Sequence, residues 1–290
     1  MSSSNIYPNQ NLSIHPFLAG LLGNLAIAIL KLSFGLFGYS KLVLMDGLFS
    51  LMSAAIFLLP WQAEVLDKKK PDERHPYGLG KILFLSMAAV GFLGLIIAIH
   101  MLFYSLMIMG WVGMRRLLTG EVMVTAISIM ANEVLYRYLM DKSKSLSNAI
   151  IALSARYNRI DVWISSFVLF LLILASLGAR YLERAGVVVI SIIVFFVGLR
   201  MVFVGFSGIM DKVPPQKVLE RIRSCAHKVN EVKDIVNIKA RYVGTFLHID
   251  MSIAVDENIS MEHADGIARN VKMRLIEKIP FAKDVNVIIA

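Results

Sequence analysis

Cysteine is nearly absent from this chain of 290 residues, and the single one, Cys225, has no partner for a disulfide within the chain. A disulfide-stabilised secreted domain is therefore excluded, and a reducing compartment is permitted for the C-terminal part. The sequence also lacks a glycine-rich phosphate-binding loop and any nucleophile and base in a known catalytic spacing. These absences predict a protein that is not an enzyme.

Charge is scarce as well, since only 18% of the residues are charged, 57% are hydrophobic and the mean hydropathy is +0.66. Such values lie outside the range of ordinary soluble domains. About 20 apolar residues are needed for a helix to cross the hydrocarbon core of a bilayer. Six runs of this length predict six transmembrane helices, at about 17–39, 42–63, 82–112, 121–139, 149–178 and 185–208.

A cleavable signal peptide is not expected, because the polar N-terminus has neither a basic segment nor a small-residue cleavage pattern before the first apolar run. Lysine and arginine concentrate in the loops after the second and fourth runs, at 67–81 and 137–145. The positive-inside rule then predicts a cytoplasmic N-terminus and, after six spans, a cytoplasmic C-terminus. The net charge of +9 is thus explained by topology, and we expect membrane lipid but no nucleic acid among the partners.

The pattern changes after residue 210, where no further long apolar run occurs. Apolar residues at helical spacing predict helices at 216–229 and 260–279, and alternating runs predict strands at 234–243, 245–255 and 284–289. The order α-β-β-α-β predicts a two-layer α+β domain of the ferredoxin or metallochaperone type. The fold class is therefore an α-helical membrane protein with a six-helix transmembrane domain, 1–210, and a C-terminal cytoplasmic domain, 211–290.

Two aspartates lie within the predicted spans, Asp46 in the second and Asp161 in the fifth. A carboxylate in hydrocarbon is costly, so each is a functional-site hypothesis. Arg156 and Arg159 share a helix face in the fifth span. We expect these arginines to neutralise Asp46 or Glu133 on a neighbouring helix, or to reach the lipid headgroups.

Three segments carry a resemblance to a known family: "KPDERHPYGLGK" at 70–81, "YNRIDVWISS" at 157–166 and "VDENISMEHADGIA" at 255–268. Together with the six spans and the α+β tail, they resemble the cation diffusion facilitator family. The segments "NEVLYRY" and "SNAIIA" are similar to its magnetosome branch. The resemblance implies a transporter that exchanges a divalent metal ion for protons in a bacterial inner membrane or a magnetosome membrane.

The resemblance further implies Fe²⁺, Mn²⁺ or Zn²⁺ as the substrate or regulator. It also implies a homodimer, or a heterodimer with a related protein, held by a tail that senses metal. Its tetrahedral metal site uses two i,i+4 pairs, one on the second span and one on the fifth. In this sequence those pairs are expected at Phe49 and Ser53 and at Tyr157 and Asp161. Since phenylalanine cannot bind a metal ion and serine binds it weakly, we expect a degenerate site.

A weaker oxygen-rich site suits a harder ion such as Fe²⁺ or Mn²⁺. Its expected members are Asp46, Ser50, Ser53, Tyr157, Asn158 and Asp161. Two hypotheses follow from the missing ligands. One is a divalent-cation transporter with a degenerate site. The other is a transport-poor member that serves as an assembly or stabilising partner of a related transporter, for example in magnetosome formation.

The resemblance also points to metal sites outside the spans. Asp72 and His75 match a metal-binding pair of the loop between the second and third spans. In the tail, His248 and Asp250 match positions near the regulatory metal sites, and Asp265 stands where a histidine is usual. By period-two alternation, His248 and Asp250 are expected on one face of a strand.

Overall fold

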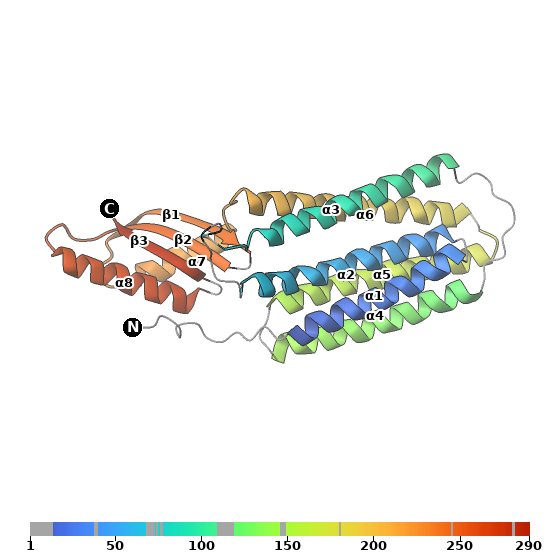
Figure 1. Cartoon of the computed structure of the whole chain (residues 1–290), viewed down its shortest axis with the longest axis horizontal. Coiled ribbons are helices and arrows are strands. Elements are labelled where there is room, and N and C mark those ends of the chain that lie inside the picture. The colour runs from blue at the N-terminus through green and yellow to red at the C-terminus, as the bar shows by residue number, and fades with distance from the viewer. Residues whose placement is uncertain are drawn as a thin grey trace. The chain divides into compact units, whose positions relative to one another are not determined.

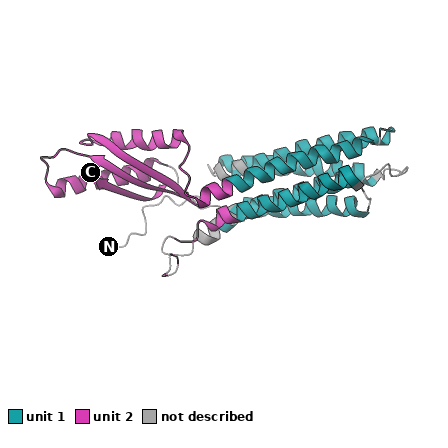
Figure 2. Ribbon diagram, turned by 90° about the horizontal axis from the view of Figure 1, so that it is seen from above, with its two compact units in different colours: residues 1–68, 86–203 teal, residues 69–85, 204–290 magenta. Residues whose placement is uncertain are grey.

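The structure, a computed structural model, describes residues 14–37, 40–67, 73, 75, 78–108, 119–145, 149–179, 181–244, 246–279 and 282–290. Two compact units divide the chain (Figure 2). One comprises residues 1–68 and 86–203, and the other comprises residues 69–85 and 204–290.

Long helices form the first unit and extend into the second. They are α1 (Ile14–Phe37), α2 (Lys41–Asp67), α3 (Ile82–Phe103), α4 (Thr119–Ser145), α5 (Ala149–Ser176) and α6 (Tyr181–Ile209), and a π-helical turn, Tyr104–Ile108, follows α3. At 1.5 Å per residue these helices are about 33 to 44 Å long, which is enough to cross a bilayer.

Five of these helices, α1, α2, α3, α5 and α6, are also apolar enough to cross a membrane. The exception is α4, which has a buried polar face formed by Glu121, Thr125, Ser128 and Asn132. These residues follow one another at helical spacing, so they lower the hydropathy of α4 while facing away from lipid. The prediction of a six-helix membrane protein is confirmed, with α4 as its polar member.

Four helices of the first unit form a ring, in which α1 packs against α2 and α4, and α5 packs against α2 and α4. In Figure 1, α3 and α6 run side by side. They approach closely at two glycines, because a Cβ atom added to Gly91 would lie 2.7 Å from the carbonyl oxygen of Gly198. Small residues at such crossings let membrane helices pack backbone to backbone.

Burial in these helices is inverted relative to a soluble protein. Large apolar side chains are exposed, such as Ile96, Phe196 and Phe203, whereas polar side chains are buried. Lipid tails can cover the exposed apolar groups, whereas polar side chains find hydrogen-bond partners only in the interior of the helix bundle. The protein is therefore a multi-pass membrane protein.

The second unit contains a small α+β domain. Its elements are α7 (Gln216–His227), β1 (Asp234–Val243), β2 (Phe246–Ala254), α8 (Met261–Lys278) and β3 (Ala282–Ile289). The strands lie in the order β1-β2-β3, with β1 antiparallel and β3 parallel to β2. The predicted order α-β-β-α-β is confirmed.

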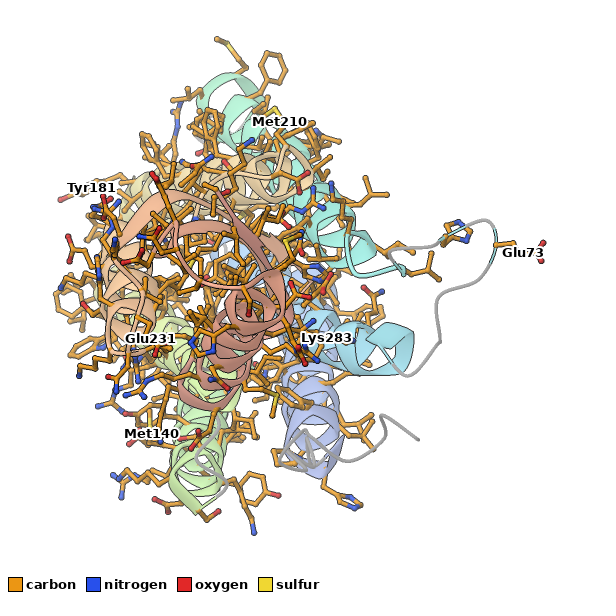
Figure 3. All side chains as sticks on the ribbon, turned by 90° about the vertical axis from the view of Figure 1, so that its left-hand side faces the viewer. Glu73, Met140, Tyr181, Met210, Glu231 and Lys283 are labelled. Carbon is orange, nitrogen blue, oxygen red and sulfur yellow. The ribbon has the colours of Figure 1, made fainter. Side chains whose placement is uncertain are left out.

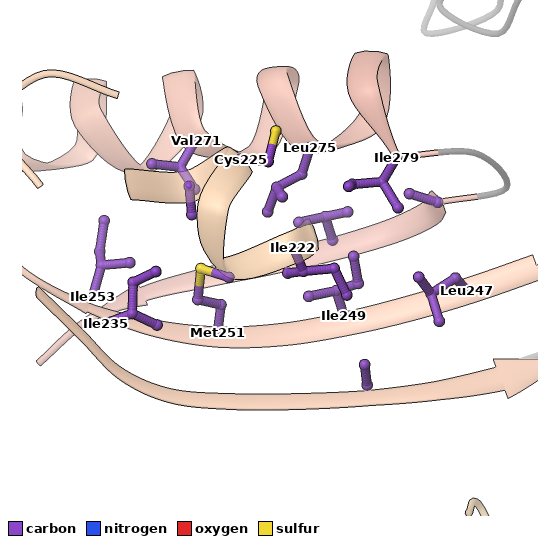
Figure 4. Close-up of a cluster of buried hydrophobic side chains, with 14 of the residues drawn as sticks. Ile222, Cys225, Ile235, Leu247, Ile249, Met251, Ile253, Val271, Leu275 and Ile279 are labelled. Carbon is purple, nitrogen blue, oxygen red and sulfur yellow. The ribbon is translucent and has the colours of Figure 1, made fainter. Parts of the chain in front are cut away.

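Both helices of this domain pack on one face of the sheet (Figure 4). Ile222 of α7 and Leu275 of α8 meet Ile249 and Met251 of β2 in a continuous apolar core. The first turn of α8 is capped by the Ser260 hydroxyl, which accepts a hydrogen bond from the backbone N–H of His263 at 3.2 Å. The opposite face of the sheet carries the polar side chains that alternate with this core.

A charged junction within the second unit ties the end of α6 to strand β1. Lys81 and Arg241 both pair with the carboxylate of Asp211, at 3.0 and 3.1 Å. Next to this junction, Gly80 lies against Gly244, which has a φ of +66°. A side chain at Gly244 would therefore be strained by the backbone conformation alone.

Candidate functional site

A lysine from α1 lies between two aspartates of the helix bundle. Lys31 Nζ is 3.0 Å from Asp46 Oδ2 of α2 and 3.4 Å from Asp161 Oδ1 of α5. It also donates hydrogen bonds to Ser50 Oγ at 2.8 Å and to Ser165 Oγ at 2.7 Å. All five side chains are fully buried. We call these five residues the lysine cluster.

The two serines of the lysine cluster connect α2 and α5 reciprocally. Ser50 of α2 donates a hydrogen bond to Asp161 Oδ1 of α5 at 3.0 Å, and Ser165 of α5 donates one to Asp46 Oδ1 of α2 at 2.9 Å. Each hydroxyl proton is thereby directed at a carboxylate, which leaves the oxygen lone pairs to face Lys31. Four oxygens thus surround one cationic nitrogen.

Each of the two helices supplies an aspartate and, four residues later, a serine, namely Asp46 with Ser50 and Asp161 with Ser165. Positions four apart share a helix face, so two helices present four oxygens to one point. This matches the expected arrangement of two i,i+4 pairs, but in a different register from the predicted pairs. The hydrogen bonds of the described residues do not join Ser53 or Tyr157 to the lysine cluster.

Ser53 is buried beside Phe49 on α2, and Tyr157 is half-buried on α5. Their role as ligands therefore stays a prediction. By contrast, Ser50 and Asn158 of the expected oxygen-rich set both form hydrogen bonds in the interior of the bundle.

The expectation that Arg156 or Arg159 neutralises Asp46 is wrong, because Lys31 does so. Arg156 is exposed, and Arg159 pairs instead with Glu133, which was the alternative partner. The Arg159 guanidinium also lies 4.9 Å from the ring centroid of Tyr136. Since this pair is partly exposed, it does not share the buried environment of Asp46.

A second polar contact lies on the same helix faces. Asn24, two turns before Lys31 on α1, donates a hydrogen bond to Asn158 Oδ1 of α5 at 2.9 Å and to the Gly20 carbonyl at 2.8 Å. Within the part of the chain that the structure describes, the buried atoms Asn24 Oδ1 and Asn158 Nδ2, and both amide atoms of Asn132, have no hydrogen-bond partner. Such unpaired groups are rare in apolar interiors, so these amides make the interior around Asn24 and Asn158 unusually polar for a membrane-spanning bundle.

The predicted loop site lies partly outside the described residues, because Asp72 is not among them. His75 is exposed, as is Glu73, two residues before it, which is labelled in Figure 3. The pairing of Asp72 with His75 therefore stays a prediction.

The predicted tail residues fall on two surfaces. His248 and Asp250 share the polar face of β2, as expected, while Asp265 is exposed on α8, which covers the other face of the sheet. The closest acidic partner of His248 is Asp284 of β3, at 3.5 Å. Among the described residues, no group of three or more histidine, cysteine, aspartate and glutamate side chains could hold a metal ion. A metal site in the tail thus stays a prediction.

His248 gives the α+β domain an expected pH dependence. Burial holds the pKa of its imidazole below the ordinary value of 6.5, Arg241 and Lys283 act in the same direction, and Asp284 and Asp250 oppose them. Between the two pKa values, His248 therefore binds a proton in the unfolded chain but not in the folded domain. Without metal, we expect the full stability of the domain above about pH 6.5 and a partial loss as the pH falls through the lower folded-state pKa of His248.

Thermal unfolding of the metal-free protein between about pH 7.5 and 5 would measure this effect. A His248→Gln variant should show a flatter decline of the unfolding midpoint, whereas His227→Gln, at an exposed position of α7, should follow the unmodified protein. Equal slopes for all three proteins would refute the prediction.

Sequence reasoning missed three residues of this interior: Lys31, Asn24 and Ser165. Signals for them are present in the sequence. Lys31 is the one charged residue of the first apolar run, and Asn24 stands seven positions before it on the same helix face. Ser165 follows Asp161 by four residues, in the spacing of Asp46 and Ser50.

Comparison with known proteins bears on both units. A family model described as the cation efflux transmembrane domain matches residues 17–210, and one described as the cation efflux protein cytoplasmic domain matches residues 214–289.

Similar proteins come from archaea and bacteria. The uncharacterised transporter MJ0449 of Methanocaldococcus jannaschii is 27% identical over 90% of this chain and 92% of its own length. The manganese efflux system protein MneP of Bacillus subtilis is 25% identical over 92% of both chains. The magnetosome protein MamM of Paramagnetospirillum magneticum is 28% identical over 90% of this chain and 84% of its own.

Proposed function

The chain belongs to the cation efflux family, whose members are the cation diffusion facilitators, and is a transporter of divalent metal cations; we propose that its transported ion binds at the oxygens of the lysine cluster. The observation that supports this site is the pair of buried carboxylates, Asp46 and Asp161, which face one cationic atom from two different helices. Such a pair in a membrane interior is the expected mark of a cation pathway.

The ligand chemistry favours a hard ion. Two carboxylates and two hydroxyls offer oxygen alone, whereas zinc sites commonly use imidazole or thiolate. Within the group of Fe²⁺, Mn²⁺ and Zn²⁺ we therefore propose Mn²⁺ or Fe²⁺ as the substrate, moved in exchange for protons. The manganese efflux protein among the relatives supports the same choice.

The remaining proposals concern the whole protein. Residues 1–210 form the transport domain and residues 211–290 the regulatory and dimerisation domain, which pairs with a second copy or with a related chain. Both termini face the cytoplasm, and the protein resides in a bacterial inner membrane or a magnetosome membrane, in contact with lipid. The family model of the tail and the magnetosome relatives support these assignments. Transport needs no enzymatic activity, and we propose none.

A second candidate function rests on Lys31. An ammonium that already neutralises the carboxylates suits a family member that transports poorly and stabilises a related transporter. Flux measurements in liposomes that contain only the purified full chain separate the two functions. Transport predicts uptake of Mn²⁺ and Fe²⁺ above that of empty vesicles and above that of Zn²⁺. No uptake of any of these ions would refute transport by the chain alone and favour the assembly role.

A further inference from the structure

Lys31 Nζ lies where a bound cation would lie. It has four oxygen neighbours, Ser165 Oγ at 2.7 Å, Ser50 Oγ at 2.8 Å, Asp46 Oδ2 at 3.0 Å and Asp161 Oδ1 at 3.4 Å. Two come from α2 and two from α5, while the ammonium itself arrives from α1. This geometry gives the protein its own cation at the centre of its oxygen ligands.

The charges forbid joint occupancy by Lys31 and a metal ion. The two carboxylates carry two negative charges, so with Lys31 in place one negative charge remains. A divalent ion added beside the ammonium would leave an uncompensated positive charge and bring two cations together in a region of low dielectric. With the ammonium withdrawn, the same ion and the two carboxylates would be neutral together.

The distances lead to the same conclusion. Oxygen ligands lie about 2.0–2.6 Å from divalent ions, which is closer than the 2.7–3.4 Å that separates them from Lys31 Nζ. An ion can therefore take the place of the ammonium only if α2 and α5 draw their oxygens inward. No room for a second cation is needed in such an exchange.

We propose that Lys31 is a tethered cation that competes with the transported metal for the four oxygens of the lysine cluster. This inference rests on the proposed ion site and gives Lys31 a role in its specificity. A tethered group acts at a high effective concentration, so a free monovalent ion gains little by replacing it. A divalent ion gains the attraction of both carboxylates, and the lysine thus selects for higher charge.

Binding of Mn²⁺ to the purified full-length protein in detergent tests this role. In Lys31→Gln the amide can still donate hydrogen bonds to the serines, but the competing charge is gone. We expect the dissociation constant for Mn²⁺ to fall about tenfold or more. Lys41→Gln is the matched control, because the Lys41 ammonium lies 5.3 Å from the Tyr104 ring centroid and outside the lysine cluster. It should bind Mn²⁺ as the unmodified protein does.

Unchanged or weaker Mn²⁺ binding by folded Lys31→Gln would overturn the proposal. Should that variant fail to fold, Lys31→Arg decides, since arginine keeps the positive charge. Binding of Mn²⁺ that is no tighter than in the unmodified protein is expected for Lys31→Arg, and tighter binding would refute competition. If Lys31→Gln binds Mn²⁺ more tightly but the unmodified protein shows no flux, the transport function is refuted and the role of Lys31 stands. If the unmodified protein shows flux but Lys31→Gln binds Mn²⁺ no differently, the role of Lys31 is refuted and the transport function stands.

Discussion

Replacing Asp161 with asparagine is expected to abolish the flux of Mn²⁺ and Fe²⁺ into proteoliposomes, with a loss of about 100-fold or more. Asparagine keeps the shape of the side chain but removes one of the two negative charges that offset a divalent ion. It also replaces the charged acceptor of the Ser50 hydroxyl hydrogen bond with a neutral amide oxygen. The ion would then enter a low-dielectric site with only Asp46 to compensate it.

The same variant is expected to remain folded, so its loss of flux can be assigned to the site. Lys31 keeps Asp46 at 3.0 Å, and this remaining pair is electrically neutral. Glu133→Gln is the matched control, because it removes a carboxylate that pairs with Arg137 and Arg159 at a partly exposed position. The control should retain its flux within about twofold, since exposed ion pairs contribute little. Flux through folded Asp161→Asn at the unmodified rate would refute the site.

The α+β domain was predictable almost residue by residue. Strand β1 was expected at 234–243 and is Asp234–Val243, and helix α8 was expected at 260–279 and is Met261–Lys278. Each helix or strand of a soluble two-layer domain has one face in water and one in the core. Its hydrophobic pattern therefore indicates both the type of element and its orientation. The alternation in β2 accordingly placed His248 and Asp250 on the polar face.

The transmembrane helices gave less information for the opposite reason. Their outer faces contact lipid and their inner faces contact protein, and both faces can be apolar. Asp46, Phe49, Ser50 and Ser53 of α2 are all buried, so the hydrophobic pattern of this helix did not show which of them face Lys31 and α5. The few polar residues carry that information, and Lys31, the one charged residue of the first apolar run, is among them.

Helix α4 shows how a polar face affects such predictions in another way. Glu121, Thr125, Ser128 and Asn132 lie inside the bundle, so lipid never meets them. They make α4 less apolar than the other five helices, and the exposed charged residues of its last turns, Asp141, Lys142 and Lys144, contribute to the same effect. Its length and its packing against α1 and α5 identify it as a member of the bundle.

Neutralising both aspartates at once, in Asp46→Asn/Asp161→Asn, is expected to lower the free energy of unfolding in detergent by about 3–5 kcal/mol. This variant leaves the Lys31 ammonium buried without either of its carboxylate partners. A single substitution lacks this effect, because one carboxylate still balances the lysine. The cost of the double substitution should therefore exceed the sum of the two single costs, which a double-mutant cycle would measure. Additive costs would contradict the charge balance described for the lysine cluster.

Adding Lys31→Met to this double variant is expected to restore most of the lost stability. Neutral side chains of similar size can replace a buried ionic cluster with little or no loss of stability, since no charge then needs desolvation. The triple variant should consequently unfold close to the unmodified protein while remaining inactive in flux. Stability and transport would then be separated at one site. If the triple variant were as unstable as the double, packing around Lys31 would be the cause, and the charges of Lys31, Asp46 and Asp161 would not determine the stability of the bundle.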